Sequence, residues 1–287
     1  MSQRIPGLSA IAANYKAVLC DVWGVLHNGR VVYRDAEQAL MTYRKQGGRV
    51  VMITNSPRRR QGVISQLMEM GVDPEAFDDI VTSGDVTRTL IQQSGDKIFH
   101  LGPERDLPLF EGLGKELVDE DQCSSIVCTG LFEDEIETPQ DYHTRLSRLA
   151  EKDVPFICAN PDLVVERGDR LIYCAGSLAK MYEELGGKTL VAGKPHAPIY
   201  NLAMQRLAQV NQGELARSDA IAIGDGMPTD VAGAISNGFD LLYISAGIHA
   251  SSYGPPDDPD QQALEASLQA NKAEATAWLP RLVWAAN

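Results

Sequence analysis

The sequence predicts an α/β protein with a doubly wound parallel sheet, into which a second α/β domain is inserted. Three observations lead to this prediction. Apolar, strand-like runs alternate with helix-like segments at the start of the chain, the same alternation returns near its end, and a separate set of apolar runs lies between the two. This alternation is typical of parallel sheets with right-handed crossovers. We therefore expect both ends of the chain to build one sheet.

The first part of the chain has a β-α-β-α-β pattern. Its expected strands are the runs AVLCD, RVVMITN and DIVTSG. A helix is expected near residues 34–46, where Gly47-Gly48 would end it. Ser56 and Pro57 suit the cap and first turn of the next helix, which should end before Gly71.

The last part of the chain repeats the pattern. The runs TLVAGK, AIAIGD and DLLYIS are expected strands, with helices near 197–210 and 229–237 between them. Residues 250–262 have the composition of a loop. We expect a final helix over about 262–285 that packs Trp278 and Trp284 against an apolar surface.

The middle of the chain carries its own strand-like runs, KIFHLG, SIVCTG, PFICAN and RLIYCA, and a helix start at Thr138-Pro139. About 100 residues can form a domain of their own. We therefore predict a core domain of residues 1–83 and 187–287 and an inserted domain of residues 84–186.

The composition restricts the partners of the protein. With 26 Lys and Arg against 39 Asp and Glu, the formal net charge is −13. Nucleic-acid binding usually needs a basic patch, so we expect no nucleic-acid partner and no anionic membrane surface. The N-terminal residues lack a signal-peptide core, and no apolar run is long enough to span a membrane. The five cysteines show no metal-finger spacing and are expected to be free thiols of a cytoplasmic protein.

Polar residues follow four of the expected core strands. They are Asp21, then Thr54 with Asn55 and Ser56, then Lys194, and finally Asp225 with Asp230. The carboxyl ends of parallel strands lie on one edge of a sheet, so these groups should meet. Two carboxylates about 4 Å apart repel by roughly 4 kcal/mol at an effective dielectric of 20, which favours a bound cation. Oxygen donors suit Mg²⁺, and a lysine beside it would complete a phosphate site.

A simpler interpretation exists for the last of these motifs, IGDGMPTDVAGA. Asp230 could merely cap the following helix, where a carboxylate favours the helix dipole, and Asp225 could lie in a turn. The ordered presence of Asp21, Thr54 and Lys194 argues for the shared site instead.

The ordered motifs DVWG, ITNS, GKP and GDGMPTD resemble those of the haloacid dehalogenase superfamily of hydrolases. The segment between the second and third motifs, with NPD at 160–162 and AGSLAKMYEELGG at 175–187, is similar to the class IIA cap of nitrophenylphosphatase-like and sugar-phosphatase-like members. The resemblance covers nearly the whole chain. It implies a Mg²⁺-dependent phosphohydrolase that acts on a small phosphorylated metabolite such as a sugar phosphate or a nucleotide.

The resemblance also implies roles for single residues. Asp21 would be the nucleophile that becomes an aspartyl phosphate, Thr54 and the Asn55 amide would hold the phosphoryl oxygens, and Lys194 would orient Asp21. Mg²⁺ would be bound by Asp21, by the backbone carbonyl of Trp23, and by Asp225 and Asp230.

Trp23 departs from the family pattern, which usually has an aspartate there as general acid and base. Indole is a hydrogen-bond donor only, and losing a general acid–base typically costs about 10²- to 10⁴-fold in rate. One interpretation is therefore a slow phosphohydrolase, or one that acts on esters with good leaving groups or borrows an acid such as His27. The alternatives are a catalytically damped phosphate-binding or sensing protein and a 2-haloacid dehalogenase. A receiver-type phosphoacceptor domain would leave the insert unexplained.

The insert offers candidate substrate residues. Asn160 ends the run PFICAN and Asp162 follows it closely; the two either face the site or form a simple Asx turn. Arg58, in the run RRR, either binds a second anionic group of the substrate or lies on a solvated helix face. Substrate identity and assembly into a homo-oligomer stay open at this point.

Overall fold

The computed structural model describes residues 2–285 of the 287-residue chain and divides into two compact units. The first unit combines the N-terminal part up to Thr54 with Ile64–Val81 and the chain from Tyr200 onward. The second unit combines Asn55–Val63 with Thr82–Ile199. Each unit therefore joins segments that are far apart in the sequence.

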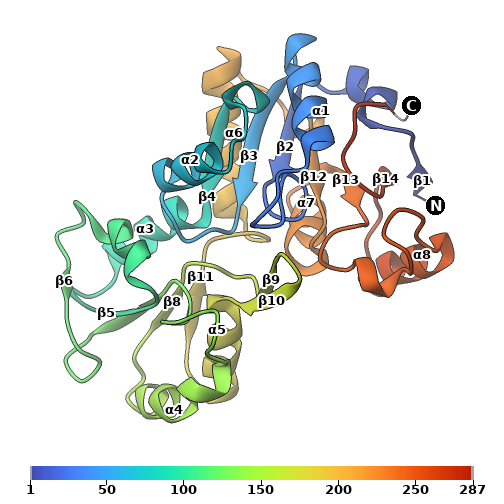
Figure 1. Ribbon diagram of the computed structural model, residues 1–287. Helices are drawn as coiled ribbons and strands as arrows, with labels where there is room; N and C mark the ends of the chain where they lie inside the picture. Colours follow the sequence, from blue (N-terminus) through green and yellow to red (C-terminus); the bar gives the residue numbers. More distant parts are fainter. Residues whose placement is uncertain (1, 286–287) are drawn as a thin grey trace. The chain divides into compact units, whose positions relative to one another are not determined.

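The first unit contains a seven-stranded sheet, flanked by helices, with the strand order β1-β14-β13-β12-β2-β3-β4 (Figure 1). The pairs from β1 through β3 are parallel, which confirms the predicted parallel α/β sheet. The strands are β1 (Gln3–Arg4), β2 (Ala17–Asp21), β3 (Arg49–Thr54), β4 (Asp79–Thr82), β12 (Ala220–Gly224), β13 (Asp240–Ile244) and β14 (Ala277–Leu279).

The central strands have the continuous apolar character of strands that are covered on both faces. Every residue of β2 and β12 is buried, and in β3 only Arg49 is not. The chain passes from β2 to β3 and β4 on one side, whereas β12, β13 and β14 lie on the other side. The strand order thus reverses at β2, and ligands of such sheets bind outside the carboxyl ends of the strands at this point.

Helices α1 (Arg34–Lys45), α7 (Ala232–Ser236) and α8 (Gln261–Ala270) belong wholly to the first unit, and α2 (Arg60–Glu69) and α6 (Ala197–Asn211) are divided by the unit boundaries. Helix α1 illustrates why they begin and end where they do. It has two acidic residues in its first turn and two basic residues in its last, which suits the helix dipole. Gly47, with φ of 95°, then takes the left-handed conformation that follows a helix end.

The C-terminal region differs from the predicted final helix over about 262–285. Helix α8 ends at Ala270, and Lys272 has φ of 52°, which interrupts the helix. Residues Ala277–Leu279 form β14, which pairs with both β13 and β1. Trp278 is completely buried in this strand. The prediction of one long helix was wrong because pairing between two neighbouring strands outweighs local helix propensity.

The second unit has its own five-stranded parallel sheet, in the order β11-β8-β7-β5-β6. A separate antiparallel pair is formed by β9 and β10. The strands are β5 (Lys97–Leu101), β6 (Glu116–Leu117), β7 (Ser125–Cys128), β8 (Phe156–Cys158), β9 (Val164–Arg167), β10 (Arg170–Tyr173) and β11 (Thr189–Val191). The helices are α3 (Ser83–Gln93), α4 (His143–Glu151) and α5 (Ala175–Glu184).

Alternate residues of these strands face two separate hydrophobic cores. Ile126 of β7 packs with the buried leucines of α4 and α5, whereas the next residue, Val127, packs with Ile91 of α3 and with Leu109. The two-residue period of a strand thus lets one sheet serve two cores.

All five cysteines are free, as the spacing predicted, and all but Cys123 are buried. Burial raises the pKa of the Cys158 thiol to about 12, so this side chain stays an uncharged part of the core. Among residues 2–285, no helix combines the length and the apolar character that crossing a bilayer requires.

Candidate active site

Three aspartates converge at the carboxyl edge of the first unit's sheet. Asp21 ends β2, and Asp225 follows β12, which pairs in parallel with β2. Asp230 lies in the π-helical turn Met227–Val231 that comes next. Carboxylate oxygens of Asp21, Asp225 and Asp230 all lie within 4.8 Å of one another, and all three residues are buried. Chain segments more than 200 residues apart thus supply one acidic cluster.

The Asp225 carboxylate is held by backbone from two other loops. Its Oδ2 atom accepts a 2.7 Å hydrogen bond from the Ile248 N–H. Gly24 and Gly247 allow this close approach, because a Cβ atom on either would lie 2.3 Å or 1.9 Å from Asp225 Oδ2. Glycine is therefore required at both positions if the carboxylate is to keep its place.

The Asp230 carboxylate is held by its own turn. Its Oδ2 atom accepts a hydrogen bond from the Gly226 N–H at 3.1 Å. The same turn is tied to the loop after β13, since the Met227 N–H donates to His249 Nε2 at 3.1 Å. The short turn 245–249 thus supports both aspartates. The site predicted from the sequence did not include this turn, although the glycine in SAGIH directly after a buried strand was an available signal.

The electrostatics of this cluster favour a bound cation. At an effective dielectric of 20, each pair of carboxylates at this separation repels by about 3 kcal/mol. Three buried oxygen donors of this kind are the ligands that Mg²⁺ prefers. The residues that the structure brings together therefore fit a hard divalent cation.

Thr54 lies at the same sheet edge. In the β2–β3 ladder Asp21 is paired with Ile53, and Thr54 is the next residue and is buried. Its position on the neighbouring strand end is the one that the sequence predicts.

Four other predicted residues form a network in the second unit. Asn55 and Lys194 are both 2% exposed, and the Lys194 N–H donates to Asn55 Oδ1 at 2.7 Å. Asn55 Nδ2 donates to Asp162 Oδ1 at 2.9 Å. The Asp162 N–H donates to Asn160 Oδ1 at 3.1 Å, which is an Asx turn. The Asx-turn interpretation of Asn160 therefore describes its geometry, and the turn also positions Asp162 against Asn55.

Arg58 has a carboxylate partner within the second unit. Its Nε atom lies 3.6 Å from Oδ1 of Asp106, whose side chain is buried. Desolvation raises the pKa of Asp106, while Arg105 and Arg58 oppose this rise. The next arginine, Arg59, similarly pairs with Glu111 at 3.3 Å. These ion pairs connect the two residues just before α2 to Asp106 and Glu111.

The turn after Asp21 packs the Trp23 ring close to two neighbours. The His27 ring meets it edge-on, with 4.9 Å between the centroids, and a Cβ atom on Gly29 would lie 2.4 Å from its Cζ2 atom. His27 Nδ1 accepts the Gly29 N–H at 2.8 Å. Burial lowers the pKa of His27 to about 4, so this imidazole is neutral at pH 7. A neutral imidazole with this hydrogen bond is a poor proton donor, which argues against His27 as a borrowed acid.

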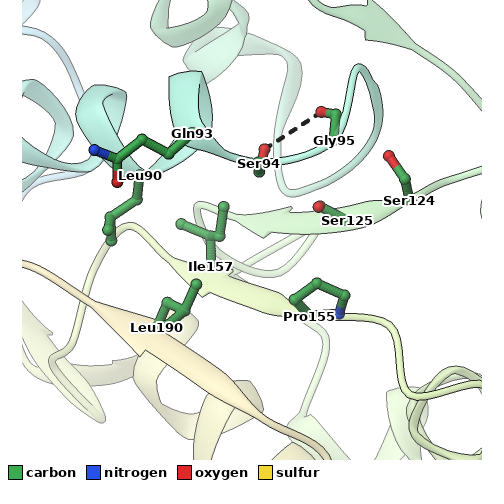
Figure 2. Close-up of a pocket in the computed structure, with 9 residues that line it drawn as sticks. All are labelled: Leu90, Gln93, Ser94, Gly95, Ser124, Ser125, Pro155, Ile157 and Leu190. Carbon is green, nitrogen blue, oxygen red and sulfur yellow. Dashed lines mark hydrogen bonds between the residues drawn. The ribbon is translucent and has the colours of Figure 1, made fainter.

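A separate pocket of about 340 Å³ lies in the second unit, between the end of α3 and the strands β7, β8 and β11 (Figure 2). Its lining includes the apolar residues Leu90, Ile157 and Leu190, and its polar residues are three serines and one glutamine. None of its nine lining residues is charged, so it lacks the groups that would bind a phosphate or a metal ion.

Comparison with known proteins agrees with this arrangement. The family model for haloacid dehalogenase-like hydrolases matches residues 18–116, and a HAD-hydrolase-like model matches residues 191–268. An acid sugar phosphatase from Staphylococcus saprophyticus is 27% identical over 82% of this chain and 88% of its own.

Two solved structures extend the comparison. A haloacid dehalogenase-like hydrolase from Brucella suis is 46% identical, covers 99% of this chain and 100% of its own, and superposes with a TM-score of 0.88. A glycerol phosphate phosphatase from Mycobacterium tuberculosis, solved with magnesium, is 25% identical over 83% of this chain and 70% of its own, with a TM-score of 0.64. The full-length match at 46% identity, together with the two family models and the carboxylate cluster, shows that the chain belongs to the haloacid dehalogenase-like hydrolases.

Proposed function

We propose that the protein is a Mg²⁺-dependent phosphohydrolase of a small phosphorylated metabolite, and that Asp21 is its nucleophile. The observation that carries this proposal is the convergence of three buried carboxylates at the switch point of the sheet. The names of two relatives, an acid sugar phosphatase and a glycerol phosphate phosphatase, support phosphate release from a small phosphorylated compound.

In this proposal each residue has a defined task. Asp21 attacks phosphorus and forms an aspartyl phosphate, and the hydroxyl of Thr54 and the amide of Asn55 hold the phosphoryl oxygens. Lys194 orients Asp21 and offsets negative charge. Asp21, Asp225, Asp230 and the backbone carbonyl of Trp23 would hold Mg²⁺, which would supply positive charge to offset that of the phosphate.

The second unit is proposed to act as the cap that selects the leaving group and excludes water. The sequence-based boundaries of this cap, residues 84–186, stay a prediction. Asp162 and Asn160 would face the substrate from the network that they form with Asn55. Arg58 would contact a second anionic group only if its ion pair with Asp106 rearranges.

The direct test is phosphate release from a broad panel of phosphorylated metabolites and aryl phosphates, with and without Mg²⁺. We expect Mg²⁺-dependent hydrolysis by the wild-type protein and loss of activity by at least 10³-fold in Asp21→Asn, because the amide is no nucleophile. Asp35→Asn, which changes an exposed carboxylate of α1, serves as the matched control. Equal rates in Asp21→Asn and wild type would refute the proposal.

A second candidate function is a damped phosphate-binding or sensing protein, which is favoured by the indole at position 23. Mg²⁺ and phosphate-mimic binding without phosphate release from any member of the panel would support it. Chloride release from a 2-haloacid without Mg²⁺ would instead support the dehalogenase alternative.

A further inference from the structure

Trp23 lies in the turn that directly follows the proposed nucleophile. Trp23 follows Asp21 by two residues and directly precedes Gly24, which is packed against Asp225. Along the chain, Trp23 therefore lies between Asp21 and the glycine that packs against Asp225. Any group that protonates the leaving oxygen from this turn has to come from its residues 22–29.

The turn holds the indole in one place. The Gly24 N–H donates to the His27 carbonyl at 2.8 Å, and the Leu26 N–H donates to the Val22 carbonyl at 2.9 Å. The His27 ring and the backbone at Gly29 both pack closely against the indole. A rotation of the Trp23 side chain would break its packing against His27 and Gly29. The indole is therefore held in one orientation.

The turn supplies no acid for the reaction. Residues 22–29 read VWGVLHNG and include no aspartate, glutamate, tyrosine, cysteine or lysine. The indole N–H donates hydrogen bonds but keeps its proton, and His27 Nδ1 is already used as the acceptor for the Gly29 N–H.

A missing acid matters only for leaving groups that need a proton. An alcohol leaves as an alkoxide, whose conjugate acid has a pKa close to the value of about 16 for water. A carboxylate leaves with a conjugate-acid pKa of about 4, like an aspartate or glutamate side chain, and a phosphate leaves with one of about 6. Acyl phosphates and phosphoanhydrides therefore need no general acid.

We propose that acyl phosphates or phosphoanhydrides, rather than alkyl phosphate esters, are the preferred substrates, and this inference rests on the proposed function. An oxygen of Asp21 bonds to phosphorus while the bond from phosphorus to the leaving oxygen breaks. The electron pair stays on that oxygen, which departs as a carboxylate or a phosphate without taking up a proton. Water then attacks the aspartyl phosphate, the bond between phosphorus and Asp21 breaks, and the proton of water passes to the released phosphate or to solvent.

Hydrolysis of the aspartyl phosphate has no general base from this turn, because no group in residues 22–29 accepts the proton of the attacking water. We therefore expect the aspartyl phosphate to accumulate during turnover. This gives a measurement that does not depend on steady-state rates, namely the fraction of protein that carries one phosphoryl group in an intact-mass spectrum.

The experiment measures hydrolysis of acetyl phosphate, glycerol phosphate and a series of aryl phosphates whose leaving groups have intermediate pKa values. The proteins compared are the wild type, Trp23→Asp and Trp23→Phe. We expect wild-type kcat/KM for acetyl phosphate to exceed that for glycerol phosphate by at least 10³-fold. Trp23→Asp should reduce this ratio by about 10²-fold or more, whereas Trp23→Phe, which restores no acid, should keep it within tenfold. A phosphorylated Asp21 should be detected in wild type.

Failure of this inference can be distinguished from failure of the proposed function. If no compound phosphorylates Asp21 or is hydrolysed, the proposed function itself fails. If Asp21-dependent hydrolysis occurs but the wild-type protein cleaves glycerol phosphate as fast as acetyl phosphate, the function stands and the substrate class is wrong. The wild-type and Trp23→Phe measurements decide this even if Trp23→Asp fails to fold.

Discussion

Asp21, Asp225 and Asp230 place three carboxylates in a small buried space, and their repulsion opposes folding unless a cation binds. Proteins commonly accept such a cost where function needs it. Replacing Asp21 by asparagine removes one charge and keeps the shape of the side chain. We expect Asp21→Asn to raise the free energy of unfolding of the metal-free protein by about 1 to 3 kcal/mol. Urea unfolding in the presence of a chelator measures this, and a less stable variant would contradict the expected repulsion.

His27 makes stability depend on pH. Burial holds its pKa at about 4 in the folded protein, below the ordinary value of 6.5, so the unfolded chain binds more protons between these values. Stability is therefore lost as the pH falls from about 6.5 toward 4. His100 has its pKa lowered to about 4 in the same way and adds to the loss. We expect His27→Gln to reduce the slope of the free energy of unfolding against pH by up to about 1.4 kcal/mol per pH unit between pH 4 and 6.5.

Urea unfolding at several pH values between 4 and 7.5 tests this prediction. His196→Gln provides the control, because His196 is exposed and its replacement should leave the slope unchanged. An unchanged slope in His27→Gln would show that His27 does not carry the effect.

Among the structural elements, the turn 245–249 after β13 supports the carboxylate cluster. Gly247 is essential to it, since a Cβ atom there would lie 1.9 Å from Asp225 Oδ2. We expect Gly247→Ala to displace Asp225 and to weaken divalent-ion binding by at least about tenfold, which is more than 1.4 kcal/mol. Titration of Mn²⁺ binding measures the affinity directly, without reliance on activity.

Gly213 is a suitable control for this substitution. Its Cβ position has only the Asn211 amide nitrogen nearby, at 3.9 Å, and its φ is not in the left-handed region. Gly213→Ala should bind Mn²⁺ like wild type. Equal affinities in all three proteins would mean that the turn does not position Asp225.

At the scale of the whole molecule, each of the two units has its own sheet. Leu146 of α4 is completely buried in the core of the second unit. Leu146→Ala should cost about 2 to 5 kcal/mol, because it removes buried methyl groups and leaves a cavity. Hydrogen exchange should show the loss of protection mainly in β7, β8 and α5.

The exposed Leu171 of β10 is the control for Leu146. It is 62% exposed, so Leu171→Ala should change stability by less than about 0.5 kcal/mol. Equal loss of protection in both units of Leu146→Ala would show instead that the chain unfolds as one cooperative body.

Local sequence patterns predicted the strands that carry the aspartates but not the C-terminal strand. The apolar runs before Asp21 and Asp225 predicted two buried parallel strands, and adjacent strands of that kind bring their carboxyl ends together. The prediction of a final helix was wrong, because Trp278 lies in a strand. Within the sheet, Trp278 is paired with Tyr243 on one side and with Arg4 on the other. Such pairing joins residues far apart in the sequence, so no local pattern reveals it.

The amino-acid order alone was sufficient for most of the alternating strands and helices, the parallel sheet and the acidic residues at its carboxyl edge, because strand and helix periods are local properties. It wrongly placed the run TLVAGK in the core sheet, since β11 pairs with β8 in the second unit. The support of Asp225 by the Ile248 N–H, the packing of Trp23 against His27 and Gly29, and the ion pair of Arg58 with Asp106 required the folded chain. Each depends on how distant backbone segments or side-chain rotamers pack in three dimensions, and that packing is a property of the whole fold.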